Sequence, residues 1–214
     1  MRWPALLFPI AALASAPAAA QAASEQVGLY EAQATEIAAA IDLRADGRFR
    51  YGLSYGALDE EGEGVWTVES GTIYLTSDPK VTPPRFALER DVPAPAGTLT
   101  VQLSDPEALG GYPLTLIVTI AGEDRPRYVD AEEDGRVPLE PGMVVTSVVP
   151  DMPVYEIPYQ PHALTPDVGH NLVFRFEPND FGKADFAREP VAIRDSTLVL
   201  ERYGRTIPFH RQQR

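Results

Sequence analysis

The chain has 214 residues, enough for one large domain or two small ones. It carries 31 Asp and Glu against 18 Lys and Arg, and this net charge of −13 disfavours nucleic acid and anionic lipid surfaces as partners. The 21 prolines do not suit helix interiors or central strands. Together with many short alternating runs, they predict an all-β fold: an antiparallel barrel or sandwich built of hairpins, with an inserted or following small β-sandwich.

Residues 1–22 have the pattern of a secretory signal peptide. Arg2 is followed by a mostly apolar stretch up to Leu13 and then by alanines, with small-x-small cleavage patterns at 18–20 and 20–22. The apolar stretch is too short to span a bilayer. The chain has no Cys, so no lipid can be attached at a cleavage-site cysteine. We therefore expect a soluble periplasmic or secreted bacterial protein with no membrane span once the leader is removed.

The next stretches predict strands and a tight hairpin. Strands are expected to start within 27–31 and 35–40, although the alanines at 38–40 also suit a helix. Between 41 and 55, apolar residues alternate with polar ones, which is the period of a half-buried strand. Asp46-Gly47 interrupts this run with the residues that a tight hairpin turn needs.

A polar connection and a second hairpin follow. Residues 55–63 contain two Gly and four acidic residues, so we expect an exposed loop there. Residues 65–68 and 72–76 read as strands around a turn at Glu69-Ser70-Gly71. Trp66 on the first of these strands is expected to anchor the core, with ligand stacking as the alternative.

These hairpins resemble a known family of barrels. Asp46-Gly47-Arg48-Phe49, then Gly64-x-Trp66, then Gly71-Thr72-Ile73-Tyr74-Leu75-Thr76 is similar to the hairpin repeat of lipocalin-like (calycin-type) bacterial envelope barrels. The resemblance implies a barrel that could hold a small apolar ligand. The candidate ligand-binding residues are aromatic and could line the barrel opening: Phe49, Tyr51, Tyr55 and Trp66. Packing of the same rings in a filled core is the simpler account.

The middle of the chain predicts a small sandwich. A strand at 85–90 leads into a proline-rich linker at 91–97, where we place a domain boundary. Short β-rich runs then follow at 98–104, 114–121, 128–129, 136–139, 143–149 and 154–159. The acidic turn and Asp134-Gly135-Arg136-Val137-Pro138-Leu139-Glu140-Pro141-Gly142 resemble carboxypeptidase-regulatory or transthyretin-like sandwiches, which implies a non-catalytic module over 98–160.

The C-terminal part returns to the pattern of the first hairpin. A strand is expected at 171–177, and strands at 196–202 and 206–210 surround Tyr203-Gly204-Arg205. The Leu-x-x-x-Gly-Arg spacing of Leu43 to Arg48 recurs from Leu200 to Arg205. We therefore predict a split barrel made of 24–90 plus 171–214, with 98–160 inserted. Two sandwiches in series are the alternative.

Chemical signatures are sparse. The sequence contains no Cys and no phosphate-binding loop, and its three histidines, His162, His170 and His210, show no catalytic spacing. The letters Gly-x-Ser-x-Gly occur at 52–56, but they end the run of alternating residues that predicts a strand, so they do not predict the strand-to-helix elbow of a nucleophilic serine. We expect no cofactor. The run that contains Asp130, Glu132 and Asp134 before Gly135 resembles the first half of a calcium loop. A solvated acidic turn is the simpler reading, since Pro141 stands where the bidentate Glu is required.

These observations predict an exported, non-enzymatic β-protein that binds a small apolar ligand or a protein of the cell envelope. One alternative is a structural or assembly factor of the envelope, which would use exposed strand edges. Another is a hydrolase of the envelope that uses carboxylates, which requires two Asp or Glu side chains in one cleft.

Overall fold

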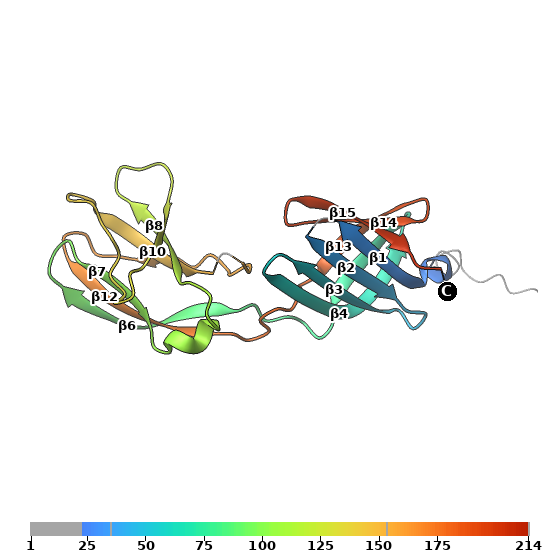
Figure 1. Cartoon of the computed structure of the whole chain (residues 1–214), viewed down its shortest axis with the longest axis horizontal. Helices are drawn as coiled ribbons and strands as arrows, with labels where there is room; N and C mark the ends of the chain where they lie inside the picture. The colour runs from blue at the N-terminus through green and yellow to red at the C-terminus, as the bar shows by residue number, and fades with distance from the viewer. Residues whose placement is uncertain (1–22, 35, 153, 214) are drawn as a thin grey trace, which may run out of the picture.

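The computed structural model describes residues 23–34, 36–152 and 154–213, so the predicted signal peptide lies outside the described residues. The regular secondary structure of the described chain is almost entirely strand, and the chain forms two lobes that lie end to end along the long axis of the molecule (Figure 1). This confirms the all-β fold class. Among the described residues, no helix has the length and apolar character needed to cross a membrane.

The first lobe is a closed antiparallel barrel whose strands come from two separated parts of the chain. Its eight strands among the described residues are β1 (Gly28–Ala34), β2 (Ile37–Leu43), β3 (Arg48–Tyr55), β4 (Leu58–Glu69), β5 (Thr72–Ser77), β13 (Ala187–Arg194), β14 (Thr197–Arg202) and β15 (Arg205–Arg211). They follow one another around the barrel in the order β1-β15-β14-β13-β5-β4-β3-β2. Pairing of β1 with β15 closes the ring and leaves the barrel without a free edge.

Alternation of apolar and polar residues explains the barrel core. Ile41, Leu43 and Phe49 are at most 1% exposed, and they face the interior from paired strands. The turn between β2 and β3 has Gly47 at φ 79°, and the Arg48 amide donates a hydrogen bond to Oδ1 of Asp46 over 2.9 Å. This is the glycine turn that the sequence predicts. The strand alternation at 37–43 also excludes the helical reading of the alanines there.

The prediction of an exposed loop at 55–63 was wrong, because most of this segment is the first half of β4. The alternation is present, but the inward positions carry Leu58, Glu60 and Gly62. Glu60 is 9% exposed, and a Cβ on Gly62 would lie 2.8 Å from Cε2 of Phe186. The inward face is therefore filled by an ion pair and by a ring from a distant segment, neither of which local sequence reveals.

The segment before β13 completes the wall beside this half of β4. The Glu61 amide donates to the carbonyl of Gly182 over 2.9 Å, and the Ala184 amide donates to the carbonyl of Glu61 over 2.8 Å. β13 itself was not expected from sequence. Its register shifts between Ala187 and Glu189, Arg188 has φ 61°, and Pro190 lies opposite Tyr74. The bulge and the proline break the alternation that marks a strand.

The second lobe is built of two sheets. The four-stranded sheet has the order β11 (His162–Ala163), β10 (Val145–Asp151), β8 (Thr115–Ile120) and β9 (Arg127–Asp130). The three-stranded sheet has the order β6 (Arg85–Ala94), β12 (Gly169–Glu177) and β7 (Leu99–Leu103). Residues of both sheets share one apolar core, which includes Val101, Leu116 and Phe174. A short 3-10 helix, η1 (Pro106–Leu109), connects β7 to β8.

Several predicted boundaries differ in this lobe. β6 and β12, which the split-barrel prediction placed in the barrel, pair with each other over their whole length in the three-stranded sheet. β6 also continues to Ala94 and so takes up residues 91–94 of the expected linker at 91–97. Residues 136–139 and the described part of 154–159 form no strand, although 135–137 hydrogen-bond along the free side of β7. Prolines at 138, 153 and 158 remove donors that a strand ladder would need.

The two lobes meet at one end of the barrel, which we call the barrel mouth and define by the turns at 56–57 and 203–204. The Tyr112 hydroxyl of the second lobe donates to the carbonyl of Ala57 over 3.2 Å. The Tyr155 ring packs against both lobes, with ring centroids 5.9 Å from Tyr112 and 4.1 Å from Phe181. Aromatic contacts thus cover the barrel mouth from the side of the second lobe.

Candidate functional site

Three of the predicted ligand-binding rings lie in the barrel core. Phe49 is 1% exposed, Tyr51 4% and Trp66 6%. The ring of Phe186 makes edge-to-face contacts with Phe49, at a centroid distance of 5.5 Å, and with Tyr51, at 5.0 Å. The indole Nε1 of Trp66 donates to the carbonyl of Arg44 over 3.1 Å. These rings therefore pack against each other and against the protein interior.

Tyr55, the fourth predicted residue, lies apart from them at the barrel mouth. It is half-buried at the end of β3, where the guanidinium of Arg205 stacks 4.8 Å from the centre of its ring. Its hydroxyl accepts a hydrogen bond from Nη2 of Arg205. The structure thus brings Phe49 and Tyr51 together around Phe186 and leaves Tyr55 with a basic partner on the β14–β15 turn.

A buried ion pair that sequence reasoning missed lies inside the barrel mouth. The side chains of Glu60 and Arg202 are 6% and 12% exposed. Nε of Arg202 donates to Oε2 of Glu60 over 3.1 Å, and its Nη2 donates to Oε1. Two phenols complete the cluster: the Tyr203 hydroxyl lies 2.6 Å from Oε1, and the Tyr51 hydroxyl lies 3.3 Å from Oε2. The carboxylate of Glu60 on β4 is therefore held by donors from two other strands, β3 and β14, and from the turn after β14.

The cluster fixes the charge of its members. Burial, and then the neighbouring carboxylate, raise the pKa of Tyr51 and of Tyr203 well above the ordinary value of a phenol. Burial acts to lower the pKa of Arg202, but the hydrogen bond and the charge of Glu60 outweigh it, so the pKa is raised. The two tyrosines thus act as neutral donors and Arg202 stays cationic, which suits a structural cluster better than proton transfer at neutral pH.

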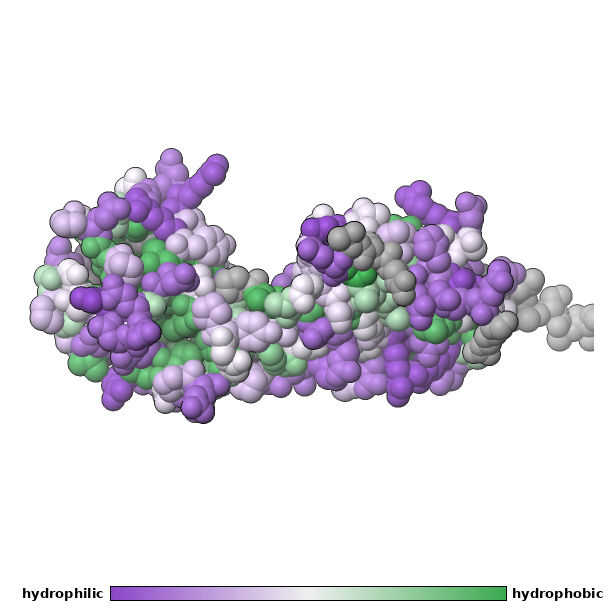
Figure 2. All heavy atoms as spheres, viewed as in Figure 1, coloured by the Kyte–Doolittle hydropathy of each residue, from purple (hydrophilic) through white to green (hydrophobic). Residues whose placement is uncertain are grey.

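An open groove of about 680 Å³ lies on the barrel wall beside this cluster. Small residues form its floor: Ala38 and Ala40 on β2 and Gly52 on β3, with Ala40 opposite Gly52 in the sheet. Tyr155 and Phe181 from the second lobe bound it at the junction. Figure 2 shows this face, on which pale residues of weak hydropathy adjoin strongly hydrophilic ones. A groove with such a flat floor can admit a chain or a ring close to the strands.

The charge on the groove has one sign. Among the described residues that line it, four are acidic, namely Glu31, Asp59, Glu60 and Glu61, and none is Lys, Arg or His. A hydrogen bond from Lys183, together with the charge of that lysine, lowers the pKa of Glu61. Asp59 accepts a hydrogen bond from the Ser54 hydroxyl over 2.6 Å. The acidic run at 59–63 could have indicated this rim from the sequence. Its interpretation as an exposed loop did not place these residues on a strand beside the groove.

A second cavity adjoins the groove at the junction of the lobes. It has a volume of about 310 Å³ and shares Glu60 and Tyr155 with the groove. Its lining also includes Arg202, Tyr203 and Lys183, and prolines of the connecting segments, among them Pro83 and Pro158. Both hollows therefore depend on how the second lobe sits at the barrel mouth.

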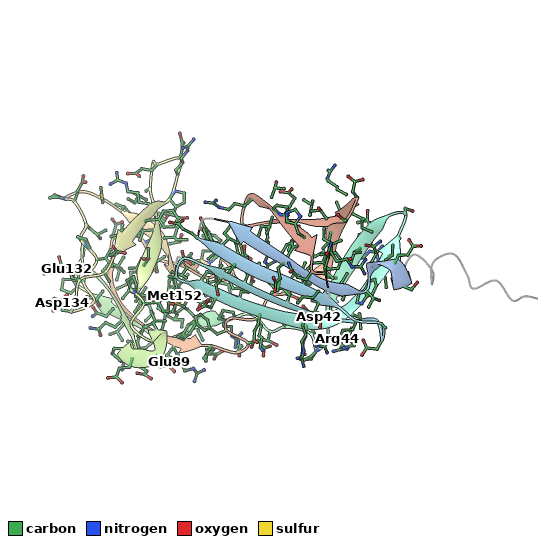
Figure 3. The ribbon with its side chains drawn as sticks, turned by 45° about the vertical axis from the view of Figure 1, so that its right-hand side comes forward. Asp42, Arg44, Glu89, Glu132, Asp134 and Met152 are labelled. Atoms are coloured by element: carbon green, nitrogen blue, oxygen red, sulfur yellow. The ribbon has the colours of Figure 1, made fainter. Side chains whose placement is uncertain are left out.

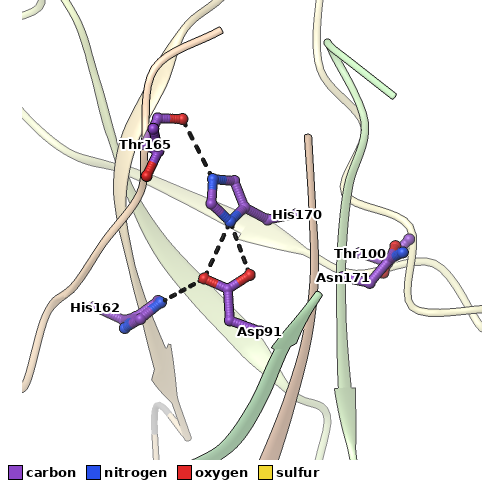
Figure 4. Close-up of polar contacts among 6 residues, drawn as sticks. All are labelled: Asp91, Thr100, His162, Thr165, His170 and Asn171. Atoms are coloured by element: carbon purple, nitrogen blue, oxygen red, sulfur yellow. Dashed lines mark hydrogen bonds and ion pairs between the residues drawn. The ribbon is translucent and has the colours of Figure 1, made fainter. Parts of the chain in front are cut away.

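Two of the three histidines meet on one aspartate in the second lobe (Figure 4). Nδ1 of His170 lies 2.8 Å from Oδ1 of Asp91, and Nε2 of His162 lies 3.2 Å from Oδ2. Burial acts to raise the pKa of Asp91, but the hydrogen bonds from His170 and His162 lower it by more than burial raises it. The pKa of Asp91 is therefore below its ordinary value. The cluster ties β6 and β12 to β11 in the other sheet.

This cluster lacks the arrangement of a hydrolytic triad. A triad histidine directs its second ring nitrogen at a nucleophilic hydroxyl. Nε2 of His170 instead lies 3.3 Å from the backbone carbonyl of Thr165 (Figure 4). The cluster could not be predicted from local sequence, because Asp91 is 71 residues from His162 and 79 from His170.

The calcium candidates are engaged in separate contacts. Oδ1 of Asp130 accepts a hydrogen bond from the Thr115 hydroxyl over 3.0 Å, and Oδ1 of Asp134 accepts one from the Arg136 amide over 3.0 Å. Glu132 forms an ion pair with Arg136. Figure 3 shows Glu132 and Asp134 at the end of the second lobe that points away from the barrel. Within the described part of the chain, no three His, Cys, Asp or Glu residues form a group that could hold a metal ion.

The geometry leaves the acidic groove at the junction as the candidate functional site. A scan against protein-family models, a search of curated proteins and a search of solved structures each found no match to this chain. The chain is therefore classified by its fold alone, as a closed antiparallel barrel with an attached lobe of two sheets.

Proposed function

We propose that this chain is an exported, non-enzymatic binding protein with a lipocalin-like barrel, and that it binds a protein of the cell envelope in the groove beside the barrel mouth. The observation that carries the proposal is the groove itself. It is open, has a volume of about 680 Å³, and combines a floor of small residues with an acidic rim. Binding sites are concave and combine apolar surface with a few polar groups.

The packed interior favours the groove over the inside of the barrel. Phe49, Trp66 and Phe186 occupy the space that a ligand in a lipocalin-like cup would take. A small apolar ligand, the other occupant that the sequence suggests, would therefore also have to bind outside the core, against Tyr155 and Phe181. Binding outside the core leaves the fold unchanged and suits association with a larger partner.

A leucine at position 52 tests the site. A Cβ on Gly52 meets no atom within 4 Å, so the side chain of Gly52→Leu begins in open space and extends into the groove. The matched control is Thr67→Leu, on the exposed face of β4 and outside the groove. We expect a thermal-shift and native mass spectrometry screen with lipids, haem-like compounds and purified envelope proteins to yield binding that Gly52→Leu abolishes and Thr67→Leu retains. Absence of any Gly52-dependent binding contradicts the proposal.

Export is tested separately. The full chain is expressed in a bacterium, and the mass of the periplasmic protein is measured. The signal pattern predicts loss of residues 1–20 or 1–22. A protein that keeps its leader and stays in the cytoplasm contradicts this part of the proposal and leaves the groove untouched.

A carboxylate-dependent hydrolase is the second candidate, because four carboxylates line one groove. Such an enzyme needs a general acid with a raised pKa. The pKa of Glu61 is lowered by Lys183, and Glu60 is bonded to Arg202, so Glu31 and Asp59 are the residues left for this role. Turnover of an envelope glycan or peptide that is lost in Glu31→Gln or Asp59→Asn would favour the hydrolase over the binding protein.

A further inference from the structure

We infer that the groove takes a cationic, extended segment of its partner, in which Lys or Arg alternates with small residues. This inference rests on the proposed function and adds the chemistry of the partner. Two independent features of the groove carry it: the sign of its charge and the shape of its floor.

The charge of the groove favours a cationic partner segment. Lys183 and Arg202 form ion pairs with Glu61 and Glu60, whereas Glu31 and Asp59 form none with the described side chains, although His210 lies opposite Glu31 in the β1–β15 pairing. The net charge of −13 on the whole chain adds a long-range field of the same sign. Complementary charge steers an oppositely charged partner to its site and rejects partners of like charge. An acidic or neutral segment would lack this advantage.

The small residues of the groove floor favour an extended partner segment. Ala38 and Ala40 on β2 and Gly52 on β3 give the occupant room to lie close to the sheet. β2 and β3 are hydrogen-bonded to neighbours on both sides, so the occupant cannot join the sheet as an added strand. Its affinity must come from its side chains: small ones against the floor and cationic ones at the rim. Alternate residues of an extended segment point in opposite directions and can supply both kinds.

The test uses the leader-free chain and two peptides that carry fluorescein on the N-terminal amine, Lys-Ala-Lys-Ala-Lys-Ala-Lys-Ala-amide and its counterpart with Glu in place of Lys. Fluorescence anisotropy is measured at low and at high salt. We expect the lysine peptide to bind and the glutamate peptide not to bind. Because the contacts are ionic and exposed, we expect affinity to fall as salt is raised.

Two variants locate the binding. Gly52→Leu fills the floor, and the double variant Glu31→Gln with Asp59→Asn removes the two uncompensated charges. The control for the double variant is Asp124→Asn with Glu133→Gln, which removes the same charge from exposed sites in the second lobe. We expect Gly52→Leu to abolish binding, and the double variant to weaken it about fivefold, as two exposed ion pairs imply. The control should bind as the unmodified protein does. Circular dichroism melts check that all variants are folded.

The outcomes separate this inference from the proposed function. If the control weakens binding as much as the groove variant, the peptide binds through net charge alone and the inference fails. If the glutamate peptide binds and Gly52→Leu abolishes that binding, the groove takes another class of polypeptide, so the inference fails and the proposed function stands. If an apolar lipid binds in this way and neither peptide does, the groove is a site for a small ligand, and both the inference and the proposed protein partner fail. If nothing binds in a Gly52-dependent way, both fail.

Discussion

The guanidinium of Arg202 forms an ion pair with the carboxylate of Glu60 inside the barrel mouth, although the two residues are 142 positions apart in the chain. The pair joins β4 from the N-terminal part of the barrel to the end of β14 from the C-terminal part. It lies between the packed core and the candidate groove, so it connects the stability of the barrel to the shape of the site.

Removing one member of this pair is expected to be costly. Arg202→Met leaves the carboxylate of Glu60 buried and uncompensated, and we expect the free energy of unfolding to fall by about 3 kcal/mol in urea titrations. Glu60→Met combined with Arg202→Met should cost less than the sum of the single changes. Arg188→Met is the matched control, since the pair between Arg188 and Glu69 is about half exposed and should matter far less. Additive single effects would show that Glu60 and Arg202 do not act as a unit.

The stability of the second lobe should depend on pH through Asp91. Its pKa in the folded protein is lowered, so its contribution is present above the unfolded value and is lost as the pH falls through the folded value. We expect Asp91→Asn to cost about 1–2 kcal/mol near neutral pH, in line with hydrogen bonds to a charged group. The difference from the unmodified protein should shrink below about pH 4. Asp124→Asn serves as the control, and a difference that persists undiminished in strong acid, where Asp91 is protonated, would contradict the role of Asp91.

Two glycines on neighbouring strands should respond in opposite ways to the same change. A Cβ on Gly62 would lie 2.8 Å from the buried ring of Phe186, whereas a Cβ on Gly52 meets nothing within 4 Å. We expect Gly62→Ala to lower the unfolding free energy by about 1–3 kcal/mol through overpacking. Gly52→Ala should be neutral or stabilising by up to about 1 kcal/mol, since alanine restricts the unfolded chain. Recovery of Gly62→Ala by Phe186→Leu would identify the ring as the cause.

Phe186 is expected to be among the most sensitive positions of the barrel. Its ring contacts Phe49 and Tyr51 in the core, and its amide and carbonyl both bond to Ser77. Phe186→Ala should lower the unfolding free energy by about 3–5 kcal/mol, because the ring leaves a cavity behind. Phe181→Ala, a half-buried ring at the junction, should cost less. Equal losses in the two variants would mean that Phe186 does not fill the barrel.

The sequence was most informative where each strand pairs with its neighbour in the chain. The hairpin around Gly47 could be predicted because its alternation and its turn are both local. The first half of β4 could not, because its inward residues are Glu60 and Gly62. Their burial depends on Arg202 and Phe186, which are more than a hundred residues away.

The site was harder to predict than the fold for the same reason. Its floor consists of alanines and a glycine, which carry no chemical signature, and its acidic rim reads locally as a solvated loop. The tie between Asp91 and His170 exists only because β6 and β12 pair in a sheet that the sequence did not predict. Aromatic residues such as Phe49 and Trp66 stand out in the sequence as candidate ligand-binding residues, but in the structure they pack in the barrel core.

The barrel pairs β1 with β15 and β5 with β13, so its wall stays incomplete until the last strands have been synthesised. All strands of the second lobe lie between Arg85 and Glu177, so this lobe has all its strands before β13 to β15, which close the barrel, are available. During that interval β1 to β5 exist as an open, curled half-sheet with two bare edges. A nascent chain of this protein therefore has a period in which neighbouring copies can pair by mistake, and it ends only when β15 reaches β1.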